Sequence, residues 1–198
     1  MKTVRLIIVA VGGQGNLLAA KVLGEAALLA GVPVRISEIH GMAQRGGVVE
    51  SAVVLGEAHS NIISDGGADV LLGFEPSETL RALGKCHRQS VVITNLAPLR
   101  PFTVAIGKGT YPDLTEVQRL LREKTQRLIT LDGLALAKQA GNAMALNMVL
   151  LGALIQAAVV PISAEQVQEA IRTKTRASLV DVNLRAFDLG LRAASGNR

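Results

Sequence analysis

The first thirty-six residues carry an apolar run that passes directly into a glycine-rich turn and then into a helical pattern. Val4–Val11 is almost entirely apolar, which is typical of a strand buried on both faces. The turn Gly12-Gly13-Gln14-Gly15 follows it, and Asn16–Ala30 then carries apolar residues at helical spacing as far as Gly31, a predicted C-terminal cap. A second apolar strand is expected at Val32–Ile36. This order of elements predicts a right-handed parallel crossover.

The rest of the sequence continues the pattern and becomes helical towards its end. Further strands are expected at 48–55, 69–74, 90–94, 102–106 and 127–131, and helices at 76–83, 113–124, 133–140, 142–159, 164–173 and 179–191. The chain is 49% hydrophobic but only 2% aromatic, so Leu, Val, Ile and Ala must build its core. We therefore predict one α/β domain over residues 1–198, a three-layer αβα sandwich with a Rossmann-like, mostly parallel sheet and a helical C-terminal third.

Composition narrows the class of partner. The net charge of +5 is compatible with an anionic ligand or an acidic partner, but the basic residues are scattered and aromatic residues for base stacking are few, which argues against nucleic acid. Cys86 is the only cysteine, so the chain can form no internal disulfide and cannot by itself hold an iron–sulfur cluster. No membrane span or cleavable signal is expected, and the predicted compartment is the cytoplasm.

The turn at residues 12–15 admits two interpretations. Gly12, Gly13 and Gly15 stand where a strand becomes a helix, so backbone amides there point outward and favour a phosphate or a carboxylate. The dinucleotide fingerprint G-x-G-x-x-G is matched only in part, because its third position is Leu18, although Glu38 stands roughly where a ribose-binding acid belongs. The alternative is that these glycines only permit a tight turn.

A second glycine-rich segment, Glu38–Gly47, follows about twenty residues later. It sets Glu38, His40, Gln44 and Arg45 among glycines that include Gly46 and Gly47. We expect these side chains to cluster at the carboxyl ends of the strands, where α/β sheets bind ligands and where Arg45 can grip a carboxylate or phosphate. The alternative is a self-bonded loop in which Glu38 pairs with Arg45. No triad order or metal-ligand spacing is found, and Cys86 is expected to be a half-buried, unreactive thiol.

Both segments, together with the end of the chain, match a known family. The sequence resembles the gamma subunit, or gamma domain, of the 2-oxoacid:ferredoxin oxidoreductases. The resemblance rests on three segments: 11–15 leading into 20–23, 37–47, and Asn183, Ala186, Phe187 and Gly190 in the last helix. The form His-Gly-Met-Ala-Gln-Arg-Gly-Gly is most similar to the small (beta) subunit of indolepyruvate ferredoxin oxidoreductase. Asn16 and Glu50 depart from the family pattern, which more often has an apolar and a small residue there.

The resemblance implies an accessory subunit without a catalytic residue of its own. The complex would decarboxylate a 2-oxoacid on thiamine diphosphate, form an acyl-CoA and pass electrons through [4Fe-4S] clusters to ferredoxin. Thiamine diphosphate, Mg²⁺ and the clusters would belong to a large partner subunit. The anion-binding, CoA-binding or interface residues would be Gly12, Gly13, Gln14, Gly15, Glu38, His40, Gln44, Arg45, Gly46 and Gly47. Without its partner the chain is expected to form a homodimer. The competing hypothesis is a free-standing nucleotide- or anion-binding α/β protein that uses the turn at 12–15.

Overall fold

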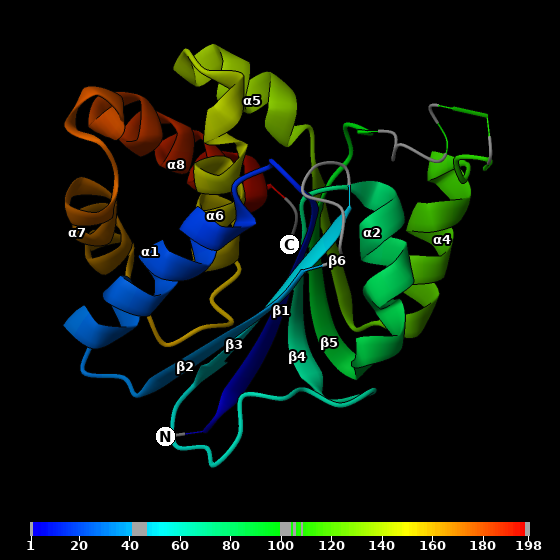
Figure 1. The fold of residues 1–198 in the computed structure, drawn as a ribbon, viewed down its shortest axis with the longest axis horizontal. Coiled ribbons are helices and arrows are strands. Elements are labelled where there is room, and N and C mark those ends of the chain that lie inside the picture. Colours follow the sequence, from blue (N-terminus) through cyan, green and yellow to red (C-terminus); the bar gives the residue numbers. More distant parts are fainter. Residues whose placement is uncertain (1, 41–46, 100–103, 105, 108, 197–198) are drawn as a thin grey trace.

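A six-stranded sheet forms the centre of the part of the chain that the structure describes (Figure 1). The structure is a computed structural model, and it describes residues 2–40, 47–99, 104, 106–107 and 109–196. The strand order is β2-β3-β1-β4-β5-β6. The strands are β1 (Val4–Val11), β2 (Val34–His40), β3 (Val48–Leu55), β4 (Ala68–Gly73), β5 (Cys86–Asn95) and β6 (Arg127–Leu131). The pairs β1–β4, β4–β5 and β5–β6 are parallel, and β3 runs antiparallel to both of its neighbours.

The strand β3 changes the crossover predicted for the first strand–helix–strand unit. β2 does run parallel to β1, but the two are not adjacent, because β3 pairs Val11 with Val48 on one side and Val34 with Leu55 on the other. β3 follows β2 directly and turns back beside it, so it fills the place next to β1. The two strands of the predicted crossover are therefore parallel but have β3 between them, and β2 is an edge strand.

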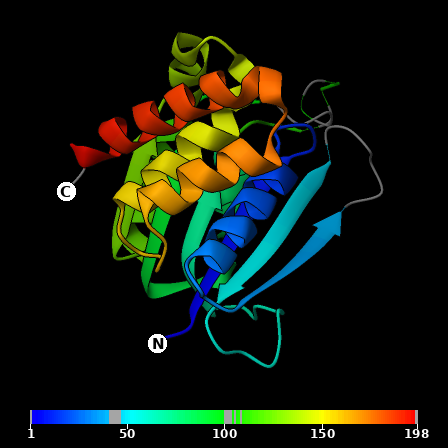
Figure 2. The same cartoon turned by 90° about the vertical axis from the view of Figure 1, so that its left-hand side faces the viewer.

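Helices cover both faces of the sheet, which confirms the three-layer sandwich. One face is covered by α1 (Asn16–Leu29), α5 (Gly133–Ala140), α6 (Leu146–Gln156), α7 (Ala164–Lys174) and α8 (Val180–Ser195), and Figure 2 looks onto this layer. The other face carries α2 (Pro76–Arg81), the 3₁₀ turn η1 (Ala82–Lys85) and α4 (Leu114–Lys124). Because side chains alternate along a strand, Leu6 and Ile8 of β1 enter the first core, and Ile7 and Val9 enter the second.

Local sequence signals set several helix boundaries as predicted. The Asp132 side chain caps α5, and Ser163 with Gln166 forms a capping box before α7. The long helix expected at 142–159 is shorter: Asn142 caps a 3₁₀ turn, η2 (Ala143–Ala145), before α6 begins. Beyond α6, Ala158 has a φ of +55°, a left-handed conformation that a helix cannot continue. A further 3₁₀ turn, η3 (Ala177–Leu179), precedes α8. The strand expected at 102–106 falls largely outside the described residues.

The helical C-terminal third depends on two close-packed helices. Gly152 of α6 faces α8, and Gly190 of α8 faces α6. A Cβ atom at Gly190 would lie 1.9 Å from the carbonyl oxygen of Val149, and one at Gly152 would lie 2.1 Å from that of Phe187. Only glycine allows the two backbones to approach this closely. Among the described residues, no helix is both long and apolar enough to cross a membrane.

Candidate functional site

The predicted glycine turn lies at the carboxyl edge of the sheet, between β1 and α1. Gly13 and Gly15 have φ values of +103° and +85°, which side-chain-bearing residues rarely adopt. Gly15 is the N-cap of α1, and no side chain caps the first-turn amides of that helix. A Cβ atom at Gly15 would also meet the Asn147 Nδ2 atom at 2.8 Å. The turn therefore presents backbone donors at the positive end of a helix, an arrangement that favours an anion.

The Phe74 carbonyl accepts hydrogen bonds from two side chains and so connects the ends of three strands. The Gln14 Oε1 atom accepts a hydrogen bond from the Val11 amide at 2.8 Å, and Gln14 Nε2 donates to the Phe74 carbonyl at 3.2 Å. Asn95 Nδ2 donates to the same carbonyl at 3.0 Å, while Asn95 Oδ1 accepts from the Gly133 amide at 3.0 Å. These bonds fix the ends of β1, β4 and β5 against the start of α5, so the edge is preorganised.

A buried carboxylate continues this edge on the side of α2. Glu75 is fully buried and caps α2, where its Oε2 atom accepts from the amides of Ser77 and Glu78 at 2.7 and 3.0 Å. Its Oε1 atom accepts from the Leu99 amide at 3.3 Å and from the Tyr111 hydroxyl. Burial, and then the neighbouring Glu75 carboxylate, raise the pKa of Tyr111 well above its usual value. Glu75 thus holds two distant parts of the 96–113 segment against α2.

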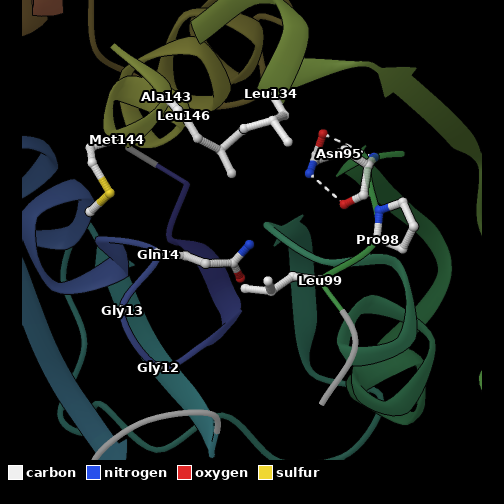
Figure 3. Close-up of a pocket in the computed structure, with 11 residues that line it drawn as sticks. Gly12, Gly13, Gln14, Asn95, Pro98, Leu99, Leu134, Ala143, Met144 and Leu146 are labelled. Carbon is white, nitrogen blue, oxygen red and sulfur yellow. Dashed lines mark hydrogen bonds between the residues drawn. The ribbon is translucent and has the colours of Figure 1, made fainter. Parts of the chain in front are cut away.

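A cavity of about 300 Å³ lies beside the glycine turn (Figure 3). Leu134 and Leu146 lie on its upper side in this view, and Gln14 and Leu99 lie below them. Its walls are mostly apolar, and its volume is at the lower end of the range for small-molecule sites. The lining residues are Gly12, Gly13, Gln14, Asn95, Ala97, Pro98, Leu99, Leu134, Ala143, Met144 and Leu146. The cavity can accept an extended, weakly polar group next to the backbone donors of the turn.

The structure brings the two predicted glycine segments together at their ends. The Gly12 amide donates to the Gly47 carbonyl at 2.8 Å, directly beyond the pairing of β1 with β3. His40 is the last residue of β2, where it pairs with Val49. The predicted residues Gln44, Arg45 and Gly46 lie outside the described residues. The described part of the site consists of the turn at 12–15, Gly47 and the cavity beside them.

Comparisons with known proteins agree with this geometry. The family model described as pyruvate ferredoxin/flavodoxin oxidoreductase matches residues 5–193. The chain belongs to this family. A curated relative from Pyrococcus horikoshii, the indolepyruvate oxidoreductase subunit IorB, is 44% identical over 196 residues, covering 98% of this chain and 97% of the relative. Because the match covers almost the full length of both proteins, the resemblance seen in the sequence is confirmed.

Solved structures share the fold of this family member at lower identity. The gamma subunit of the keto/oxoacid ferredoxin oxidoreductase from Geobacter sulfurreducens superposes with a TM-score of 0.72 at 22% identity, covering 98% of this chain and 99% of that one. The 2-oxoglutarate:ferredoxin oxidoreductase from Magnetococcus marinus, solved with 2-oxoglutarate, coenzyme A and succinyl-CoA bound, gives 0.74 at 19% identity. The match covers 99% of this chain but 32% of that larger one. The α/β fold predicted from the sequence is thus shared with gamma subunits.

Glu38 does not lie where a dinucleotide-binding protein needs an acid. It is an exposed residue within β2, opposite Ser51 of β3, and Ser51 in turn pairs with Ile8 of β1. Ile8 lies three residue steps before Val11, so Glu38 stands about 10 Å below the carboxyl edge, and β3 lies between its strand and β1. Glu38 is not among the residues that line the cavity beside the turn. The structure of this pyruvate ferredoxin/flavodoxin oxidoreductase family member therefore does not favour the free-standing nucleotide-binding alternative.

Two other sequence-based expectations concern single polar residues. Burial raises the pKa of the Cys86 thiol to about 11, and a hydrogen bond to Ser90 only partly offsets this effect, so the basic neighbours do not activate it. Asn16, which departs from the family pattern, is buried and donates to the Ser51 hydroxyl at 3.2 Å. Its NH₂ group is therefore hydrogen-bonded inside the fold.

Several residues that shape the site were not predicted from the sequence. Asn95, Glu75 and Tyr111 form the polar framework described above, and Met144 lines the cavity. A signal existed for two of them: Asn95 ends a predicted strand, and Glu75 directly precedes a proline at the start of a predicted helix. No local pattern pointed to Tyr111 or Met144, because their roles depend on partners far away in the sequence.

Proposed function

We propose that this chain is the accessory, gamma-type subunit of a thiamine-diphosphate-dependent 2-oxoacid:ferredoxin oxidoreductase of the indolepyruvate class. The complex would convert a 2-oxoacid oxidatively to an acyl-CoA, with ferredoxin as electron acceptor. The family match over residues 5–193 and the relative named indolepyruvate oxidoreductase subunit, matched over nearly its whole length, support this proposal. The whole chain, residues 1–198, would act as one gamma-type domain in the cytoplasm.

The cofactors of the reaction would belong to a large partner subunit. A [4Fe-4S] cluster needs four ligands, usually thiolates, and this chain has a single cysteine whose pKa is raised by burial. Within the described ranges, no three His, Cys, Asp or Glu side chains stand close enough together to hold a metal ion. We therefore assign thiamine diphosphate, Mg²⁺ and the clusters to the partner, and no catalytic residue to this chain. Ferredoxin would meet the complex through the partner.

The carboxyl edge is the surface that we propose to face the catalytic subunit. The observation that carries this proposal is the Gly12–Gly47 hydrogen bond, which joins both glycine segments beside the apolar cavity. The backbone amides of Gly13 and Gly15 would bind a phosphate of CoA or a carboxylate of the partner, while the amides of Gly12 and Gln14, which donate to the Gly47 and Val11 carbonyls, would hold the turn in shape. His40, Gln44, Arg45, Gly46 and Gly47 would extend this surface, with Arg45 as its anchor for an anion. Glu38, lower on β2, would contribute only at the margin of the interface.

The isolated chain is proposed to form a homodimer. Ile39 on the edge strand β2 is 66% exposed, and Leu28 and Ile62 are large exposed hydrophobic residues as well. Within the described sheet β2 is the edge strand, and no other strand pairs with its outer side. A second copy would cover these residues and this edge in the absence of the catalytic subunit. Light scattering at rising protein concentration tests this, and a monomer throughout would contradict it.

Co-expression with the large thiamine and iron–sulfur subunit of the same organism tests the function. We expect a stable complex that reduces ferredoxin or a viologen dye when indolepyruvate and CoA are supplied. Arg45→Ala separates two roles: lost assembly marks Arg45 as an interface residue, whereas intact assembly with weaker CoA saturation marks it as a CoA contact. Arg88→Ala, an exposed arginine near the start of β5, is the matched control and should change neither. Failure of the pair to assemble would refute the proposal.

A further inference from the structure

A second cavity of about 340 Å³ lies on the other side of the N-terminus of α1. It opens between the start of α1, the η2–α6 junction and the connection from α7 to α8. The lining residues are Gly15, Leu18, Asn142, Met144, Ala145, Asn147, Lys174, Thr175, Arg176, Leu179 and Asn183. Met144 also lines the first cavity and stands between the two. None of the other residues of the second cavity lines the first, so the two are separate sites.

An asparagine side chain without a partner faces this cavity. Asn183 of α8 is only 6% exposed, yet its amide makes no hydrogen bond to any part of the chain that the structure describes. Its polar atoms are not among the fully enclosed, unsatisfied atoms of the described residues, so water or a ligand in the cavity can reach them. Asn183 lines the cavity, and its amide is therefore available to a bound molecule.

Two further asparagines fix the polar floor of the cavity. Asn147 Nδ2 donates to the Gly15 carbonyl at 3.2 Å and so holds the start of α1 in place. Asn142 Oδ1 accepts from the Met144 amide at 2.9 Å, which leaves its NH₂ group without a partner in the described structure. Both asparagines line the cavity. The side chains thus add hydrogen-bond donors beside the uncapped amides of α1.

The charge around this cavity is positive. The N-terminus of the fourteen-residue helix α1 contributes the positive end of its dipole. Lys174 is paired with Glu25 at 2.8 Å, so its charge is largely balanced. Arg176 is exposed and forms no ion pair with another described residue. Helix dipole, amide donors and one unbalanced guanidinium therefore meet at the same cavity.

We propose that this second cavity binds a phosphate group. Its polar side chains offer mainly donors, no carboxylate lines it, and Arg176, which no described carboxylate neutralises, can form paired hydrogen bonds with phosphate oxygens. The cavity exceeds the size of phosphate alone, so either inorganic phosphate with water or the phosphate of a monoester fits. The inference does not depend on the proposed function, because it concerns a site formed by this chain alone.

Titration calorimetry with the full chain in a phosphate-free buffer tests the site. Inorganic phosphate and AMP are titrated in separate experiments, with adenosine as the ligand that lacks phosphate. Saturable binding of phosphate alone identifies free phosphate as the occupant, and tighter binding of AMP identifies a monoester. Both outcomes support the proposal. Binding of adenosine as tight as that of AMP, or no binding of either phosphate compound at millimolar concentrations, would overturn it.

Matched variants connect binding to the residues of the cavity. Asn183→Leu removes the amide and should weaken phosphate binding at least about tenfold, since a hydrogen bond to a charged group contributes about 1.5–3 kcal/mol. Arg176 is exposed, so Arg176→Gln should leave folding intact and weaken phosphate binding several-fold. This variant keeps the test valid if Asn183→Leu fails to fold. Arg172→Gln removes an equal charge from α7 outside the cavity and is the control. Equal losses for Arg176→Gln and Arg172→Gln would contradict a built site.

Discussion

Replacing Gly190 by alanine tests the close contact between α6 and α8. A Cβ atom at this position would lie 1.9 Å from the carbonyl oxygen of Val149, and backbone atoms cannot rotate away as a side chain can. An ordinary C···O contact is about 3.3 Å, so the two helices must separate locally by roughly 1.4 Å. The buried core residue Phe187 lies on α8 at this interface and would move with it.

The energetic cost follows from the lost contacts. A gap of about 1 Å forfeits up to about half of each dispersion contact of 0.1–0.2 kcal/mol, and a large buried side chain makes roughly 40 of them. The interface therefore loses about 3 kcal/mol. Alanine favours the helical conformation over glycine by about 1 kcal/mol, which offsets part of this loss. We expect Gly190→Ala to lower the free energy of unfolding by about 2 kcal/mol, or the melting temperature by about 4–8 °C.

Urea titration and differential scanning calorimetry measure this change. Gly196→Ala is the matched control, because Gly196 is the C-cap of the same helix and its Cβ would meet no atom within 4 Å. This control should stay within about 0.5 kcal/mol of the parent chain. A Gly190→Ala variant as stable as the Gly196→Ala control would refute the close approach of α6 and α8.

Two further predictions concern buried polar groups. Because the pKa of the Cys86 thiol is raised to about 11, it should react with a thiol reagent at pH 8 about a hundredfold more slowly in the folded chain than in urea. In the folded chain its reaction rate should rise about tenfold per pH unit towards that pKa. Equal rates in both states would contradict the burial of the thiol. Glu75→Gln replaces a carboxylate that accepts from five donors with an amide, and it should lower the free energy of unfolding by about 3 kcal/mol. Tyr111→Phe removes only one of these donors and should lower the free energy of unfolding by about 1–2 kcal/mol. Urea titration measures both changes, and an unchanged midpoint for Glu75→Gln would contradict the role of the carboxylate.

Local signals were sufficient for most elements of the fold. The apolar run 4–11, the glycine turn and the capping residues Asp132 and Ser163 act within a few residues of where they stand, so the sequence alone placed them correctly. The family resemblance rested on the same kind of local motif, and the family match confirms it. Short-range hydrogen bonds and periodic burial explain this success.

The order of the strands and the framework of the site depend on long-range contacts. Nothing between residues 34 and 55 says that β3 will take the place next to β1, because an apolar run fits a parallel or an antiparallel neighbour equally well. This ambiguity also misplaced Glu38. Gln14 and Asn95 meet at Phe74 from positions 60 and 21 residues away, and Asn183 joins a cavity with Gly15 from the far end of the chain. These long-range contacts form only once the chain is folded.

The position of β3 also bears on how the chain emerges during synthesis. β1 is made first, but its partners on both sides come later: Val4 pairs with Leu55, and Leu6 with Val70. The 44 residues between Val11 and Leu55 take roughly 2–9 s to translate at about 5–20 residues per second. Throughout this interval the apolar, β-prone segment 4–11, with Arg5 as its one charge, has no strand to pair with. The nascent chain therefore exposes an aggregation-prone segment at this stage, and because both faces of β1 are buried after folding, charges that shield this segment must stand outside its buried residues.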